Sequence, residues 1–348
     1  MLNKRILYYS ATLIIGAYFL FLGLSEARDI LAPLLTAVIL ALVILPLANK
    51  MESKMKRSYS SLLNTLLLFL VSVALIALLS FQVKAVVEKW PEIKETMKPK
   101  IEQAQNFISE NTPLQLRSLQ NSEDGSFSLS QGSNTGEMIT TAFSSTMAFM
   151  GTYLLTFIYI FFLLNYRNRF KSFLFDLFPD EKKDEVEKIT NESASVVQQY
   201  LVGKLLLIGF IAILYCIGLG VSGISNFILL SIIAAILTLI PYIGNIIGFA
   251  VVIVFGYLTS GETGVLIGII VTFTAAQFVE SYILQPYVVG DKVDLHPFFV
   301  ILAVIIGNAV WGVIGMILSI PVLAIVVIVF LHIPPLKPFG FLFSNKEY

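Results

Sequence analysis

One carboxylate, Glu280, stands alone in an apolar stretch that covers residues 264–285. Gln277, Ser281 and Gln285 have the spacing that places them on the same side of a helix as Glu280. A carboxylate in hydrocarbon is energetically costly, so such a side chain usually faces a cavity or a partner. There it can bind a cation, exchange a proton or accept hydrogen bonds from a polar solute. The competing interpretation is an interfacial Glu280 that reaches water, because the run ends about a turn and a half later.

A second group of candidate residues surrounds prolines inside apolar runs. Pro241 and Pro321 interrupt the apolar stretches that precede and follow Glu280. Proline removes a backbone hydrogen bond, and in lipid the freed carbonyl needs another partner. Transporters place broken helices of this kind at their binding sites. A proline kink or a simple helix end is the alternative. The residues assigned to the candidate pathway are Glu280, Gln277, Pro241, Tyr242, Gly244, Asn245 and Pro321.

A compact polar loop lies between these two stretches. It contains Asp291, Lys292, Asp294 and His296, whose opposite charges either gate a pathway or solvate a turn. His296 and His332 are the only histidines, and they lack the spacing of metal ligands. The sequence shows no nucleophile–base or metal constellation, so we expect neither an enzyme nor a bound cofactor or metal.

The candidate residues require membrane-spanning helices to position them. The 348 residues are 57% hydrophobic and 13% charged, against about 45–50% and about 25% in soluble domains. Apolar runs near the length of about 20 residues that spans hydrocarbon begin at residues 6, 31, 62 and 298. Net charge is zero, and no basic stripe suggests nucleic acid as a partner. The sequence predicts an all-α polytopic membrane protein of about eight transmembrane helices, with broken or re-entrant segments in its C-terminal half.

Lysine- and arginine-rich loops indicate which segments are cytoplasmic. The resulting map has N-terminal transmembrane helices (1–83), an extracytoplasmic amphipathic insert with a mobile loop (84–138), a transmembrane helix (139–166), a cytoplasmic amphipathic helix (167–199), a C-terminal transmembrane core with broken helices (200–333) and a tail (334–348). The first apolar run is longer than a typical signal-peptide core, so we expect a retained helix. The number of crossings after residue 224 stays open.

An ordered set of motifs in the second half carries a family resemblance. It comprises Tyr200-Leu201-Val202-Gly203-Lys204, Ile240-Pro241-Tyr242-Ile243-Gly244, Gln277 with Glu280, Leu295-His296-Pro297, Trp311-Gly312 and Ile320-Pro321. The chain resembles the AI-2E family, also called the autoinducer-2 exporter or PerM-type permease family, and the first half agrees in layout. The resemblance implies an inner-membrane transporter that forms a homo-oligomer. Asn245 departs from the pattern, because many relatives carry proline there.

Four functions follow from these observations. The first is a carrier for a small polar solute such as a quorum-sensing signal, which the resemblance implies for some members of the family. The second is an antiporter that exchanges sodium or lithium for protons at Glu280, although few other intramembrane carboxylates are present. The third is a membrane scaffold that transports nothing. The fourth, a membrane enzyme, is disfavoured because no nucleophile–base or metal constellation is present. Apart from the solute or cation, the expected surroundings are the lipid bilayer and further copies of the chain.

The distribution of lysine and arginine predicts a membrane topology that can be tested. The N-terminus and residues 49–57 and 167–199 are expected in the cytoplasm, and residues 84–136 outside. Single cysteines labelled with an impermeant reagent in intact cells check this. Ser126→Cys should react from outside, whereas Lys54→Cys should react only after lysis. The reverse pattern contradicts the map.

Overall fold

The computed structural model describes residues 4–88, 95, 99, 135–224, 226–241, 243–257, 260, 262–288 and 295–345. Within these ranges the chain is helical, with one isolated β-bridge between Leu295 and Ser344. Six of the described helices are long and apolar enough to cross a membrane. The predicted fold class, an all-α polytopic membrane protein, is confirmed.

The six spans are distributed over the whole chain. They cover Arg28–Glu52, Arg57–Leu78, Phe149–Asp176, Asp180–Val221, Thr263–Leu284 and Val313–His332. Shorter apolar helices cover Ile14–Glu26, Phe227–Leu237, Ile243–Gly256 and Pro297–Trp311. Several of these shorter helices lie in the C-terminal half, where the sequence predicts broken segments.

The N-terminal half consists of long helices. They are α1 (Lys4–Glu26), α2 (Arg28–Glu52), α3 (Arg57–Glu88), α5 (Thr135–Asp176) and α6 (Asp180–Val221). Most of the insert expected at residues 84–138 lies outside the described residues. Helices α5 and α6 are longer than the predicted crossings, because the charged segment 167–199 is divided between them: α5 continues to Asp176 and α6 begins at Asp180.

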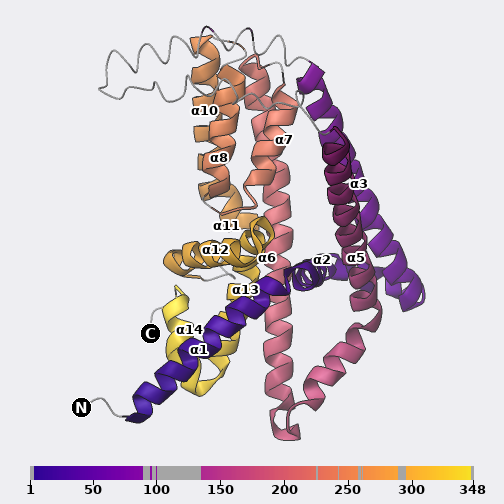
Figure 1. Cartoon of the computed structure of the whole chain (residues 1–348), viewed down its shortest axis with the longest axis vertical. Helices are drawn as coiled ribbons and strands as arrows, with labels where there is room; N and C mark the ends of the chain where they lie inside the picture. Colours follow the sequence, from indigo (N-terminus) through magenta and orange to yellow (C-terminus); the bar gives the residue numbers. More distant parts are fainter. Residues whose placement is uncertain are drawn as a thin grey trace.

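Helix α6 is the element around which the others are arranged (Figure 1). Its 42 residues extend about 63 Å at 1.5 Å per residue, roughly twice the thickness of the hydrocarbon layer. Charged residues fill the first turns, and the apolar residues follow from Tyr200 onward. Figure 1 shows α7 (Phe227–Leu237), α8 (Ile243–Val252) and α10 (Thr263–Val279) beside its C-terminal half.

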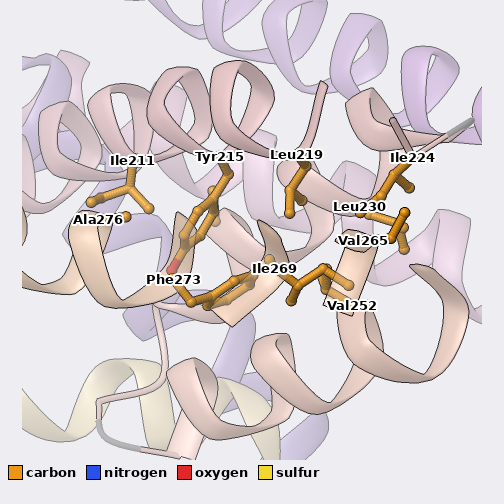
Figure 2. Close-up of a cluster of buried hydrophobic side chains, with 12 residues drawn as sticks. Ile211, Tyr215, Leu219, Ile224, Leu230, Val252, Val265, Ile269, Phe273 and Ala276 are labelled. Atoms are coloured by element: carbon orange, nitrogen blue, oxygen red, sulfur yellow. The ribbon is translucent and has the colours of Figure 1, made fainter. Parts of the chain in front are cut away.

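The largest cluster of buried side chains joins these helices. Ile211, Tyr215 and Leu219 project from α6 at intervals of four residues and meet Ile269 and Phe273 of α10 (Figure 2). The rings of Tyr215 and Phe273 stack with centroids 4.4 Å apart. Such close contact fixes α10 against α6, and with it the residues that follow α10 in the chain.

The remaining C-terminal elements are mostly short. They are η3 (Ile253–Tyr257), η4 (Glu280–Leu284), α11 (Gln285–Val288), α12 (Pro297–Trp311), α13 (Val313–His332), η6 (Pro334–Leu336) and α14 (Lys337–Phe343). Two of them, η3 and η4, are π-helical turns that widen the helix before them. A break between α7 and α8 falls at Pro241, as the proline predicts.

The second break does not fall at its proline. Pro321 lies inside α13, which runs without interruption, and the turn is at Gly312 instead. Gly312 has φ +63° and ψ −140°, a backbone conformation that glycine adopts without strain. Helices α12 and α13 then pack so closely that a Cβ atom on Gly315 would lie 1.9 Å from the carbonyl oxygen of Gly307. This hairpin buries Pro321, and its packing outweighs the one hydrogen bond that proline removes.

The close approach of α12 and α13 predicts a sharp effect of a single methyl group. Gly315→Ala should lower the unfolding midpoint of the protein in detergent, because overpacking costs about 1–3 kcal/mol. Gly209→Ala is the matched control, since a Cβ atom there meets nothing within 4 Å. Thermal unfolding followed by size-exclusion chromatography measures both. Equal midpoints for the two variants would refute the backbone contact.

Candidate functional site

A cavity of about 430 Å³ lies where the interrupted helices meet α6. Five parts of the chain form its wall: α6, the turn between α7 and α8 with the start of α8, the segment from α10 to α11, the start of α12, and α13. The lining residues are Tyr200, Lys204, Leu207, Thr238, Pro241, Asn245, Gln277, Glu280, Ser281, Gln285, Leu295, Pro297, Val300 and Ile320. Polar and apolar side chains both contribute, so the cavity can hold a polar molecule within apolar surroundings.

An ion pair between α6 and η4 stands in this wall. The Nζ atom of Lys204 lies 3.8 Å from Oε1 of Glu280, and their side chains are only 15% and 8% exposed. This distance is longer than a hydrogen bond, so the charges attract without filling each other's hydrogen-bonding capacity. Among the described residues the second carboxylate oxygen, Oε2, is buried and accepts no hydrogen bond. The pair therefore offers a free acceptor, and an ammonium that donates no hydrogen bond to Glu280.

The packing of α10 against α6 brings the two charges together. Ile211 follows Lys204 by seven residues on α6. Ala276 of α10 precedes Glu280 of η4 by four residues in one continuous helical span, so each pair shares a helix face. Ile211 and Ala276 belong to the same buried cluster. The helix widens into the π-turn η4 at Glu280 itself, an irregularity that is frequent at functional sites.

One hydrogen bond between amide side chains connects α8 with α10 beside the ion pair, and a second one continues from it to a hydroxyl group. The amide of Asn245 donates to Oε1 of Gln277 over 2.8 Å, and Gln277 donates to the hydroxyl of Ser281 over 3.1 Å. Asn245 follows the break at Pro241, so the hydrogen bond links the broken segment to the helix of Glu280. The structure thus groups four residues that the sequence analysis assigned to the pathway: Pro241, Asn245, Gln277 and Glu280.

Other predicted residues take different places. Gly244 is buried behind the cavity wall, where a Cβ atom would lie 1.7 Å from the carbonyl oxygen of Leu237. Pro321 does not line the cavity, although its neighbour Ile320 does. His296 caps α12 by accepting a hydrogen bond from the backbone N–H of Phe298, and it lies between two lining residues. Tyr242 and the proposed gate residues Asp291, Lys292 and Asp294 lie outside the described residues.

The sequence analysis missed Lys204 as a site residue. The signal was present, because Lys204 is the only charged residue between Tyr200 and Leu219, as Glu280 is in its own run. A second missed group joins the end of α2 to α5. Arg167 of α5 binds the carboxylate of Glu52, with one contact at 2.8 Å, and the amide oxygen of Asn49, also at 2.8 Å. No periodicity connects Arg167 with Glu52 and Asn49, which lie 115 and 118 positions before it.

A multi-pass helical protein with a charged, partly polar cavity among its apolar helices has the architecture of a membrane transport protein. The sequence model of the AI-2E family transporters matches residues 8–334, so the chain belongs to the AI-2E transporter family. It is therefore a membrane transporter by family, which agrees with the resemblance seen in its motifs.

Individual relatives are similar over most of their length. YueF of Bacillus subtilis (strain 168) is 27% identical over 313 residues, which cover 86% of this chain and 83% of YueF. MT0215 of Mycobacterium tuberculosis (strain CDC 1551 / Oshkosh) is 25% identical over 307 residues, or 86% of this chain and 82% of the relative. Both are named as candidate transport proteins, and neither name includes a substrate.

The buried ion pair predicts a characteristic pattern of stabilities. Lys204→Met leaves a buried carboxylate without its cation and should cost about 3–5 kcal/mol. The double variant Lys204→Met/Glu280→Gln removes both charges and should recover most of that loss. Unfolding of purified protein in detergent measures the single and double variants in one cycle. Strictly additive losses would show that the two side chains do not interact.

Proposed function

We propose that this chain carries a small, neutral polar solute across the inner membrane. The solute binds in the cavity that Lys204 and Glu280 line. The observation that carries the proposal is the ion pair with unfilled hydrogen-bonding capacity on the cavity wall. A hydroxyl group can accept a hydrogen bond from the ammonium and donate one to the carboxylate. A solute with several hydroxyl groups therefore matches the wall, and a quorum-sensing signal of the autoinducer-2 type falls within this class.

The charge of the site favours a neutral solute over a cation. Lys204 already occupies a position 3.8 Å from the carboxylate. A metal cation bound beside Glu280 would meet the ammonium at about 4 Å, where two like charges repel by about 4 kcal/mol at an effective dielectric constant of 20. A neutral solute meets no such repulsion, because the pair has no net charge.

Cation/proton antiport is the second candidate function. The observation in its favour is the buried Oε2 atom of Glu280, which has no hydrogen-bond partner among the described residues and can take up a proton. In that mechanism Lys204 has to move away whenever the cation binds. The two functions therefore differ in whether the carboxylate titrates during the transport cycle.

Transport by purified protein in liposomes tests the proposal with a panel of hydroxylated solutes and with imposed sodium or proton gradients. Glu280→Gln keeps the size of the side chain and removes its charge. We expect the initial rate to fall at least about tenfold, which corresponds to about 1.4 kcal/mol, while the amount of folded protein stays the same. Glu262→Gln is the matched control, because it makes the same change at the exposed N-terminal end of α10.

Two outcomes decide between the candidates. If the transport rate depends on pH in the same way in the wild type and in Glu280→Gln, the carboxylate does not exchange a proton during transport. Antiport through Glu280 is then wrong. If sodium movement driven by a proton gradient is the activity lost in Glu280→Gln, the neutral solute is wrong. Unchanged transport in Glu280→Gln would place the pathway away from this cavity.

A further inference from the structure

One edge of the cavity lies at the open end of a helical hairpin. We call this edge, residues 295–300, the α12 edge; its lining residues are Leu295, Pro297 and Val300. Helices α12 and α13 are joined at their other end, by the turn at Gly312 and the close approach of Gly307 to Gly315. The α12 edge therefore needs a further element to keep it in the cavity wall.

Helix α14 supplies that element through its backbone. After α13 the chain reverses direction over residues 333–336, and Figure 1 shows α14 beside α13 and below α12. The backbone N–H of His296 donates to the carbonyl oxygen of Phe343 over 2.9 Å. Leu295 and Ser344 form the isolated antiparallel bridge next to this hydrogen bond. The end of α14 is thus attached directly to the α12 edge.

The side chain of Phe343 connects both helices of the hairpin. Its ring centroid lies 4.5 Å from that of Phe299 on α12 and 6.0 Å from that of Phe330 on α13. Gly340 brings α14 close to α13, because a Cβ atom there would lie 2.9 Å from the backbone nitrogen of Leu331. Helix α14 therefore bridges the open ends of α12 and α13.

The outer side of α14 is uncovered within the part of the chain that the structure describes. Phe339 and Leu342 are 51% and 56% exposed, whereas Gly340 and Ser344 on the inner side are buried. The chief packing partners of α14 are α13 and the short turn η6 before it. Because its contacts with the α12 edge are few, α14 can detach in a local opening that leaves the buried cluster of α6 and α10 intact.

We propose that α14 together with Ser344 is a latch on the cavity. While it is docked, it holds the α12 edge in the wall and the cavity stays closed on this side. When it detaches, the α12 edge moves about the turn at Gly312 and opens the cavity, since a few residues at the end of an element can absorb such a motion. The latch regulates the site of the proposed function and rests on it, because access matters only if a solute enters the cavity.

The reactivity of a thiol inside the cavity tests the latch without any transported solute. Thr238 lines the cavity and is only 3% exposed, so Thr238→Cys reacts when the cavity opens. The change is made together with Cys216→Ala, which removes the cysteine that the chain already contains. Full-length protein in detergent is treated with N-ethylmaleimide, and mass spectrometry of its peptides gives the rate of labelling at position 238.

Two variants loosen the latch in different ways. Phe343→Ala removes the bridging ring and should raise the labelling rate about fivefold to tenfold, since aromatic contacts stabilise the docked form. Gly340→Ala should act in the same direction, because its methyl group pushes α14 away from α13. Leu342→Ala is the matched control, as this neighbouring side chain is exposed, and it should leave the rate unchanged.

A disulfide closes the latch in the same assay. Leu295 and Ser344 are opposite residues of the bridge that exchange no hydrogen bond with each other, a pairing with Cα atoms about 4.5 Å apart. This separation suits a disulfide in Leu295→Cys/Ser344→Cys. Oxidation should lower the labelling rate at position 238 at least about fivefold, because the local opening can no longer occur. Reduction of the same protein should restore the rate.

Two results would overturn the latch. The first is an equal labelling rate at position 238 in the oxidised and reduced forms of the disulfide variant. The second is an equal rise in Phe343→Ala at Ser231→Cys, a fully buried position on α7 outside the cavity, since α14 then only stabilises the fold. If the latch variants behave as expected but hydroxylated solutes are not transported, the latch is supported and the proposed function fails.

Discussion

Two opposite charges separated by 3.8 Å, inside helices that are otherwise apolar, set the main constraint on this structure. Removing an ion from water costs several kcal/mol even after the protein relaxes, and only a partner or a polar cavity offsets that cost. The buried cluster of α6 and α10 is what holds the partners near each other, since Ile211 and Ala276 lie on the same helix faces as Lys204 and Glu280. The short helices around α6 then enclose the pair and leave the space that a solute can enter.

Part of this arrangement was predictable from the sequence. The solitary carboxylate Glu280 predicts a partner or a cavity, because lipid provides neither. The same argument applied to the solitary Lys204 would have predicted that this residue also needs a partner or a cavity. What could not be predicted is that these two residues meet, since 76 positions separate them and helix periodicity contains no information on which helices pack together. The hydrogen bond between Asn245 and Gln277 could not be predicted for the same reason.

The two prolines show a second limit of sequence reasoning. Pro241 and Pro321 have similar apolar neighbours, but only Pro241 stands at a break between helices. Both prolines follow an isoleucine in an apolar run, so the proline alone does not decide the outcome, and the surrounding packing contributes. Around Pro321 the backbone contact of Gly307 with Gly315 stabilises a continuous α13, and the positive φ of Gly312 provides the turn. At Pro241, the backbone of Gly244 packs closely against the carbonyl group of Leu237, and this contact stabilises the break between α7 and α8.

The net charge of the site also bears on how transport is driven. A carrier has to return its empty site across the membrane, and a lone carboxylate would move one charge, worth about 2.3 kcal/mol per 100 mV of membrane potential. A carboxylate paired with an ammonium has no net charge, whether the site is empty or holds a neutral solute. The membrane potential then exerts no net force on either half of the cycle through these two groups. If the chain is the carrier of a neutral solute proposed above, flow would follow the concentration gradient of the solute. Protonation of Glu280 would break this balance and leave Lys204 as an uncompensated cation. Under that proposal, the pairing of Lys204 with Glu280 is the feature that distinguishes passage down a gradient from coupling to protons.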